Sequence, residues 1–270
     1  MSEADIIKET EFPLSRRSLA AALRACGLME GQVVLVHSSM SKLGWIVGGA
    51  EAVILAFLDV LGENGTLMMP THTSDNSDPA RWENPPVPEA WWSLIREMTP
   101  AFDPKTSPSR MMGALPELFR TWPGTIRSDH PVASFAAKGP AARYLTSDQS
   151  LEADLGNDSP IGKLYELDGF VLLMGVGHMN NTSIHLAEHR GSFPGKKYIQ
   201  TGSSILVDGN QHWVTYETLD LNDEDFNELG AEFERTHSVV VRQIGKADVR
   251  LFKQRSLVDF AVDWMESNRI

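Results

Sequence analysis

Residues 33–70 of the sequence, VVLVHSSMSKLGWIVGGAEAVILAFLDVLGENGTLMMP, decide the fold. The stretch begins with an apolar run at 33–37 and ends with a second one at 66–69. Short, nearly continuous apolar runs are typical of strands that are buried on both faces of a sheet. Between them, an apolar pattern with helical spacing at 50–61 follows a turn rich in serine and glycine. A strand, a helix and a second strand in this order predict a βαβ unit with a right-handed crossover.

The rest of the chain continues the alternation of helices and strands. Apolar periodicity predicts helices at 15–27, 109–122 and 182–190 and strands at 132–137 and 170–176. This alternation predicts an α/β protein, for which we expect a mixed central sheet flanked by helices.

The last third of the chain carries a β-hairpin signal. Asp208-Gly209-Asn210 lies between short apolar runs at 205–207 and 213–216, and Asp-Gly is a frequent hairpin turn. Further elements finish the chain at 223–236, 239–244, 249–252 and 256–268. No composition break marks a linker, so we expect one domain over 1–270, with a smaller lobe from 71–100 and 198–220.

Composition narrows the class of protein. The 270 residues include 24 Lys and Arg against 36 Asp and Glu, so the formal net charge is −12, and 42% are hydrophobic. These values exclude a mainly disordered chain, and the acidic balance argues against a nucleic-acid partner. The single cysteine, Cys26, rules out an intrachain disulfide and favours a reducing compartment. With a polar N-terminus and no apolar segment of about 20 residues, we expect a cytoplasmic protein with no membrane partner.

Two strand-to-helix turns have residues suited to chemistry. The first, at 36–50, offers serine hydroxyls, glycines and a helix start, a combination that suits a phosphate-bearing ligand. Taken alone, such a turn is more often structural. The second, at 175–190, places His185 and Glu188 three residues apart on one helical face, where a carboxylate can orient an imidazole that acts as a base.

The second turn has two other interpretations. The first is an ordinary surface contact between a histidine and a glutamate. The other is the H-x-x-E-H pattern of one zinc-peptidase class, which His185, Glu188 and His189 match. The third zinc ligand that this pattern requires cannot be assigned from the sequence.

Taken together and in order, the motifs resemble the aminoglycoside 3-N-acetyltransferases, the antibiotic N-acetyltransferase family. The similar segments include LVHSSMSKLGWIVGGAEAV (35–53), GTLMMPTHT (65–73), SPSRMMGALPELFR (107–120), RSDHPVASFAAKG (127–139) and LLMGVGHMNNTSIHLAEHR (172–190). The resemblance covers nearly the whole chain. It implies the α/β fold of this family, unlike the GCN5-type acetyltransferases, and transfer of an acetyl group from acetyl-CoA to the 3-amino group of an aminoglycoside, which gives antibiotic resistance.

The resemblance also assigns residues. In the pattern T-x-x-H-x-A-E, Thr182, His185 and Glu188 match the catalytic positions of the family. It implies that acetyl-CoA contacts His37, Ser38, Ser39, Leu43, Gly44, Trp45, Gly48 and Gly49, with Thr71, Ser107, Arg110 and Met111 near the thioester. The family positions of His178 and His189 vary, which weakens the zinc interpretation, and we expect no metal. From the resemblance alone we expect a homodimer.

The chemistry of the reaction agrees with these assignments. An amine must lose a proton before it attacks, and histidine is the side chain best suited to accept one near neutral pH. We expect His185 to be this base, Glu188 to orient its ring, and Thr71 or Thr182 to contact the oxyanion, in a direct transfer without an acyl-enzyme. The acceptor is a polycationic amine, for which we expect contacts with Asp75, Trp82, Glu83, Asn84 and Glu217. A CoA-dependent acyltransferase for a different amine remains the other alternative.

Overall fold

The βαβ unit predicted from residues 33–70 forms the centre of the molecule. In the computed structural model, which describes residues 2–269, β1 (Val33–Ser38), α4 (Gly49–Leu61) and β2 (Thr66–Pro70) follow one another as expected. Strand β1 pairs in parallel with β2 on one side and with β5 (Phe170–Met174) on the other. The carboxyl ends of these three strands therefore lie at the same edge of the sheet.

Antiparallel strands complete the sheet on both sides. The order is β3-β4-β2-β1-β5-β9-β8, with β3 (Ile126–Arg127), β4 (Phe135–Lys138), β8 (Val240–Ile244) and β9 (Ala247–Lys253). The mixed central sheet is thus confirmed. The strand predicted at 132–137 begins only at Phe135, because the backbone N–H groups of Val132 and Ala133 donate to Nδ1 of His130 and form a turn.

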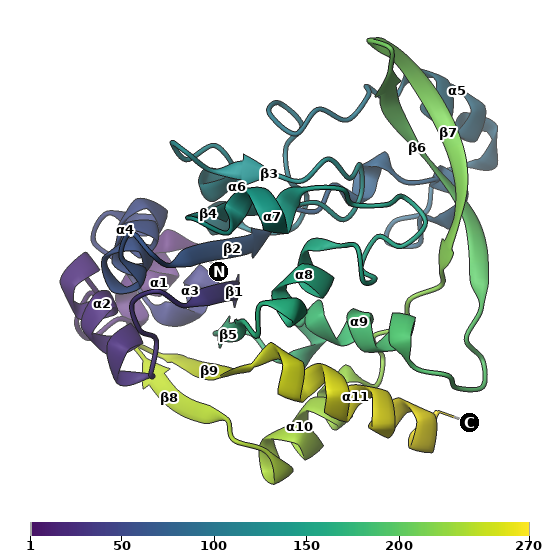
Figure 1. Ribbon diagram of the computed structural model, residues 1–270. Coiled ribbons are helices and arrows are strands. Elements are labelled where there is room, and N and C mark those ends of the chain that lie inside the picture. The colour runs from purple at the N-terminus through teal and green to yellow at the C-terminus, as the bar shows by residue number, and fades with distance from the viewer. Residues whose placement is uncertain (1, 270) are drawn as a thin grey trace.

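Side chains alternate across the central strands, so the sheet has a core on each face. Val34 and Val36 of β1 pack on one face, whereas Leu35 between them packs on the other. Figure 1 shows helices on both faces of the sheet. The first face is covered by α2 (Arg16–Ala25), α3 (Met40–Leu43), α4 and α6 (Ala114–Arg120). The second is covered by α7 (Ala142–Thr146), α8 (Pro160–Glu166), α9 (Ser183–Arg190), α10 (Phe226–Thr236) and α11 (Gln254–Asn268).

The helix predicted at 109–122 is shorter than expected. Helix α6 begins at Ala114, which puts Pro116 in its first turn, where the missing N–H of a proline breaks no helical hydrogen bond. The residues before it form a loop in which Met111 adopts a φ of 59°, a left-handed conformation that no helix allows. Among residues 2–269, no helix combines the length and the apolar character needed to cross a bilayer.

The segments predicted to form a smaller lobe lie together beside the sheet (Figure 1). They contain α5 (Trp92–Met98), the 3₁₀ turns η1 (Ser74–Asn76), η2 (Pro79–Arg81) and η3 (Glu89–Trp91), and the hairpin strands β6 (Tyr198–Val207) and β7 (Asn210–Leu219). Asp208 and Gly209 turn the hairpin with φ values of 50° and 78°, as a two-residue turn of this kind requires. The Asn76 amide joins the two segments, because it both donates to and accepts from the backbone of Ser204.

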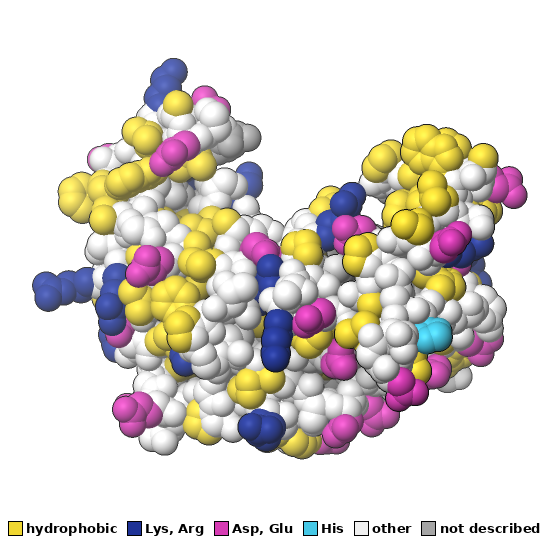
Figure 2. Space-filling view, turned by 90° about the horizontal axis from the view of Figure 1, so that it is seen from above, with side chains coloured by type: hydrophobic (Ala, Val, Ile, Leu, Met, Phe, Trp, Pro, Cys, Tyr) yellow, Lys and Arg dark blue, Asp and Glu magenta, His cyan; other side chains and the backbone are white. Residues whose placement is uncertain are grey.

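The surface of this part carries several exposed hydrophobic side chains. Figure 2 shows the molecule hollowed between two raised parts, with hydrophobic side chains gathered on the right-hand one, the side on which Figure 1 places α5 and the hairpin. Exposed hydrophobic residues of these elements are Trp91, Leu94, Met98, Tyr198, Leu206 and Val207. The remaining elements are α1 (Glu3–Glu9) near the N-terminus and η4 (His178–Asn180) before α9.

Candidate active site

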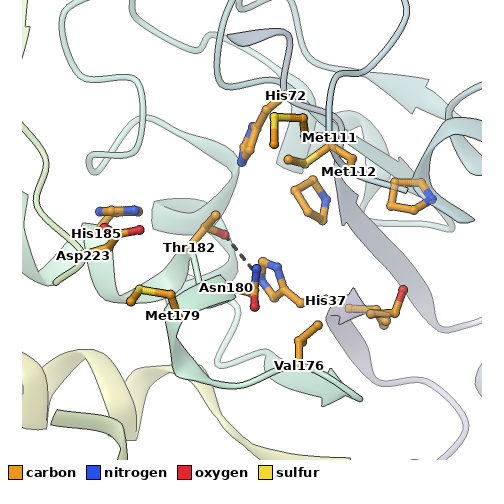
Figure 3. A pocket seen from close by; sticks show the side chains of 14 residues that line it. His37, His72, Met111, Met112, Val176, Met179, Asn180, Thr182, His185 and Asp223 are labelled. Carbon is orange, nitrogen blue, oxygen red and sulfur yellow. Dashed lines mark hydrogen bonds between the residues drawn. The ribbon is translucent and has the colours of Figure 1, made fainter. Parts of the chain in front are cut away.

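Two adjoining cavities open at the carboxyl ends of β1, β2 and β5. The first, which we call the histidine cavity, has a volume of about 250 Å³ and is lined by His37, His72, Thr182, His185 and Asp223, together with Ser38, Asn180 and apolar side chains (Figure 3). The second, the serine cavity, measures about 640 Å³ and is lined by 38–41, 111–116, 175–177 and Asn180. The cavities share Ser38, Met111, Met112, Pro116, Val176 and Asn180, so a ligand that fills one can reach into the other.

Helix α9 carries the reactive pair of the histidine cavity. Nδ1 of His185 lies 2.5 Å from Oε2 of Glu188, and the ring of Phe226 packs 4.8 Å from the imidazole. A carboxylate only accepts hydrogen bonds, so Nδ1 is the donor, and a neutral His185 then has its lone pair on Nε2. Within residues 2–269, Nε2 makes no hydrogen bond, and the ring borders the cavity. The arrangement can accept a proton from a ligand.

A hydroxyl at the start of α9 faces the histidine cavity. The side chain of Asn181, just before this helix, accepts from the backbone N–H of Ser183. Thr182 makes no capping bond, and its Oγ1 lies 3.4 Å from Nε2 of His37 across the cavity.

Two further histidines line the cavity in neutral form. Burial lowers the pKa of His37 to about 3, and the nearby His72 and His185 lower it further in the same direction. Burial likewise lowers the pKa of His72 to about 4. Neither ring nitrogen of His72 has a partner within the described part of the chain, although the ring packs edge-on against Phe135. A buried imidazole with no partner is available to a ligand.

Comparison with known proteins now bears on this geometry. The family model described as aminoglycoside 3-N-acetyltransferase matches residues 35–266. The chain belongs to this family. It is 44% identical to the SPbeta prophage-derived aminoglycoside N(3')-acetyltransferase-like protein YokD of Bacillus subtilis (strain 168), over 97% of this chain and 96% of that protein. It is 38% identical to the aminoglycoside N(3)-acetyltransferase VII of Streptomyces paromomycinus, over 98% of this chain and 96% of that one.

A solved relative extends the match to three dimensions. The structure described as AAC-IIIb binary with CoASH superposes with a TM-score of 0.86 at 31% identity, over 96% of this chain and 98% of that chain. The resemblance, the fold of this acetyltransferase family and the prediction of an acyltransferase are thereby confirmed. The zinc-hydrolase alternative is not favoured.

Within the family fold, the residues expected to contact acetyl-CoA separate into two groups. His37, Ser38, Ser39 and Met111 line one or both cavities. Leu43, Gly44, Trp45, Gly48 and Gly49 are absent from both linings. Leu43 is part of the core beneath α4, and Trp45 donates to Glu3 and to Thr10 near the N-terminus, which draws this part of the turn away from the cavities.

Thr71 and Ser107 lie just behind the cavity wall and are bound by a buried arginine. Nε of Arg127 donates to Oγ1 of Thr71 at 3.1 Å, and Nη1 donates to the carbonyl of Ser107. Thr71 is fully buried, so its hydroxyl does not border either cavity. Arg110 is on the surface, with Nη1 3.6 Å from Oδ2 of Asp75.

The residues expected to bind the amine lie outside both linings. Asp75 faces Arg110, Trp82 donates to Ser77, and Glu83, Asn84 and Glu217 are exposed. The carboxylate that does border the histidine cavity is Asp223, which precedes α10 and lies on the same side of the cavity as His185 in Figure 3.

The residues of the H-x-x-E-H pattern do not converge on one point. His185 contacts Glu188, whereas Nε2 of His189 lies 3.5 Å from Oδ1 of Asp154. Across residues 2–269, no group of three or more His, Cys, Asp or Glu side chains is arranged to hold a metal.

Sequence reasoning missed His72, Asp223 and Arg127. His72 lies two residues after β2, so its position near a strand end was the available signal. No local pattern marks Asp223 or Arg127, because their roles depend on contacts with segments that are far away in the sequence.

Proposed function

We propose that this protein transfers an acetyl group from acetyl-CoA to the 3-amino group of an aminoglycoside, with His185 as the general base. One observation carries the proposal. The 2.5 Å contact with Glu188 fixes the His185 ring by Nδ1 and leaves Nε2 on a cavity that adjoins a second, larger one. A base, an amine site and a thioester site are then within reach of one another.

The reaction follows as a direct transfer in a ternary complex. The amine nitrogen attacks the thioester carbonyl carbon, so a C–N bond forms and a tetrahedral oxyanion develops. His185 Nε2 accepts the proton that the amine loses. When the C–S bond breaks, CoA leaves as a thiolate, which takes up a proton to become the free thiol. No covalent intermediate with the protein is needed, and the only cysteine, Cys26, is buried in the core.

We assign acetyl-CoA to the serine cavity and the amine to the histidine cavity. The shared lining at Ser38, Met111 and Asn180 is where the thioester would meet the amine. The relative AAC-IIIb was solved with CoASH, which supports acetyl-CoA as the co-substrate. Thr182 is better suited than Thr71 to donate to the oxyanion, because Thr182 borders the histidine cavity whereas Thr71 is fully buried and absent from both linings.

Asp223 is our candidate for binding the acceptor. It borders the cavity beside His185 and makes no ion pair with any residue of 2–269. A carboxylate here can hold an ammonium group of a polycationic sugar while a neighbouring amine faces His185. The net charge of −12 favours the approach of such a ligand.

The test is release of CoA thiol from acetyl-CoA across a panel of aminoglycosides, with mass spectrometry to locate the acetyl group. We expect thiol release that depends on the antibiotic and one added acetyl group at the 3-amino position. Stabilisation by CoA without acetylation of any panel member would mean that the acceptor is a different amine. Inactivation by a chelator would instead support a metal hydrolase.

Two further expectations belong to this proposal. We propose a cytoplasmic location, in keeping with the free, buried Cys26. The homodimer stays a prediction, which the molar mass in solution would test.

A further inference from the structure

Glu188, the partner of His185, is only 1% exposed, and both of its carboxylate oxygens accept hydrogen bonds. Oε2 accepts from His185, while Oε1 accepts from Nη1 of Arg269 at 2.7 Å and from the backbone N–H of Asn222 at 3.0 Å. A buried carboxylate is costly unless a positive charge and hydrogen bonds compensate it. Arg269, immediately after α11, supplies that charge.

Arg269 is itself held in one orientation. Its Nε and Nη2 donate to the two oxygens of Asp225, each at 2.7 Å, and Nη2 also donates to the carbonyl of Asn222 at 2.8 Å. The guanidinium carbon lies 4.9 Å from the centre of the Phe193 ring. The Arg269 side chain is only 12% exposed, so its ion pairs with Glu188 and Asp225 are largely shielded from solvent.

We propose that Arg269 is a positioning residue that sets the proton affinity of the His185–Glu188 pair and holds the Asp223 segment at the acceptor site. The inference rests on the function proposed above. Arg269 lines neither the histidine cavity nor the serine cavity, so it does not contact the reacting atoms. It acts through Glu188 and through the backbone around Asp223.

The effect of Arg269 on the proton affinity of the pair follows from the charges around it. Whichever atom of the His185–Glu188 pair holds the extra proton, a nearby positive charge disfavours the protonated pair. Removing the charge of Arg269 therefore makes the pair easier to protonate. Since only the deprotonated pair can accept a proton from the amine, the acid limb of the rate profile must move to higher pH.

The other groups that face the pair leave Arg269 as its main positive neighbour. His37 from β1 and His72 after β2 face His185, and burial keeps both neutral because it lowers their pKa values to about 3 and about 4. Asp223 before α10 adds a negative charge on the cavity side. Lys196 also acts on Glu188, but its Nζ donates to the carbonyls of His189 and Gly191.

The positioning part follows from the chain around Asp223. Arg269 binds the carbonyl of Asn222 and the carboxylate of Asp225, which are on either side of Asp223. Without the guanidinium, this segment loses its three bonds to Arg269 and keeps the Asn222 N–H contact with Glu188 and its local bonds, such as that from the Phe226 N–H to the Asp223 carbonyl. The KM for the amine should therefore rise together with the change in pH dependence.

The experiment measures kcat/KM for the amine from pH 5.5 to 9.5 in Arg269→Met, Arg269→Lys and Asp225→Asn. Arg269→Met should move the midpoint of the acid limb up by about one pH unit, so that the loss is about tenfold at low pH and small at high pH. Arg269→Lys keeps the charge and should keep the midpoint near that of the wild type. Asp225→Asn removes a competing carboxylate from Arg269 and should move the midpoint down.

Arg255→Met is the matched control on the same helix. Arg255 at the start of α11 donates to the carbonyls of Tyr165 and Glu166, so its loss should lower the melting temperature and leave the midpoint unchanged. The inference is overturned if the midpoint of the acid limb stays fixed in both Arg269→Met and Asp225→Asn. That result is expected if the pKa of the substrate amine alone sets this limb. If Arg269→Met does not fold, the direction of the Asp225→Asn shift decides.

His185→Ala, measured in parallel, separates the two proposals. If it stays active, His185 is not the base, and that part of the proposed function is wrong. If it is inactive while neither midpoint moves, only the role of Arg269 is wrong.

Discussion

The two strand-to-helix turns of this protein look alike in sequence but contribute differently to the site. After β5, the chain passes through η4 directly into α9, so that Thr182 and His185 in the first turns of that helix border the histidine cavity. After β1, the short helix α3 intervenes, and α4 begins only at Gly49. There, Ser38 and Ser39 reach the cavities, whereas Gly48 and Gly49 do not.

The difference shows that serine and glycine content does not decide which residues of a strand-to-helix turn border the cavities. Backbone N–H groups at the start of α4 have no acceptor within that helix, but Gly48 and Gly49 are absent from both cavity linings. The glycines of this turn instead allow backbone conformations that close it, with φ values of 93° at Gly44 and 81° at Gly48.

The largest difference between the two strand-to-helix turns is expected when one histidine is removed from each, His185 after β5 and His37 at the end of β1. His185→Ala should lower kcat/KM by about 10²–10⁴-fold, because the amine loses its base, while the Kd for CoA stays unchanged. His37→Asn should cost no more than about tenfold, since a histidine with a pKa of about 3 is a poor base near neutral pH. A His185→Ala enzyme within a few-fold of the wild type, measured by thiol release, would refute the base assignment.

Substitutions of acidic residues test whether the amine binds at the histidine cavity or at the smaller lobe. Asp223→Asn should raise the KM for the amine about tenfold through loss of a charged contact, with little change in the KM for acetyl-CoA. Glu83→Gln and Glu217→Gln are the controls, because both carboxylates are exposed and absent from the cavity linings. Steady-state kinetics in which the Glu217→Gln effect exceeds that of Asp223→Asn would move the amine site to the hairpin.

Within the turn after β1, we expect effects on acetyl-CoA binding at residues that line the serine cavity and none at residues outside it. Ser39→Ala should raise the KM for acetyl-CoA about three- to tenfold, the effect of one lost hydrogen bond. Trp45→Phe should leave it unchanged, because that indole donates to Glu3 instead. Equal effects of the two substitutions on acetyl-CoA binding would mean that the whole turn contacts the co-substrate.

The smallest effect concerns stability in acid. His37 and His72 have pKa values of about 3 and about 4 in the folded protein, below the value of about 6.5 in an unfolded chain. Between these values the unfolded chain binds more protons, so stability falls as the pH drops below about 6.5. Melting temperatures from pH 7 to 4.5 should fall less steeply for His37→Asn than for the wild type, and parallel curves would contradict this account.

The sequence predicted the fold well where burial imposes a period. The strands of 33–70 and the 170–176 run were found because side chains on both faces must be apolar. It also found the His185–Glu188 pair, since three residues in a helix make one face. Arg269 escaped prediction because it lies 81 residues from Glu188, and no local pattern connects them. Asp223 escaped for the same reason, as its position depends on how α10 packs.

The most direct test of His185 as the base is a crystal structure with CoA and an aminoglycoside bound together. The account predicts the thiol of CoA at the junction of the two cavities and the 3-amino nitrogen within about 3.2 Å of Nε2 of His185. An acceptor amine bound instead against Asp75 and Glu83, out of reach of that imidazole, would contradict it.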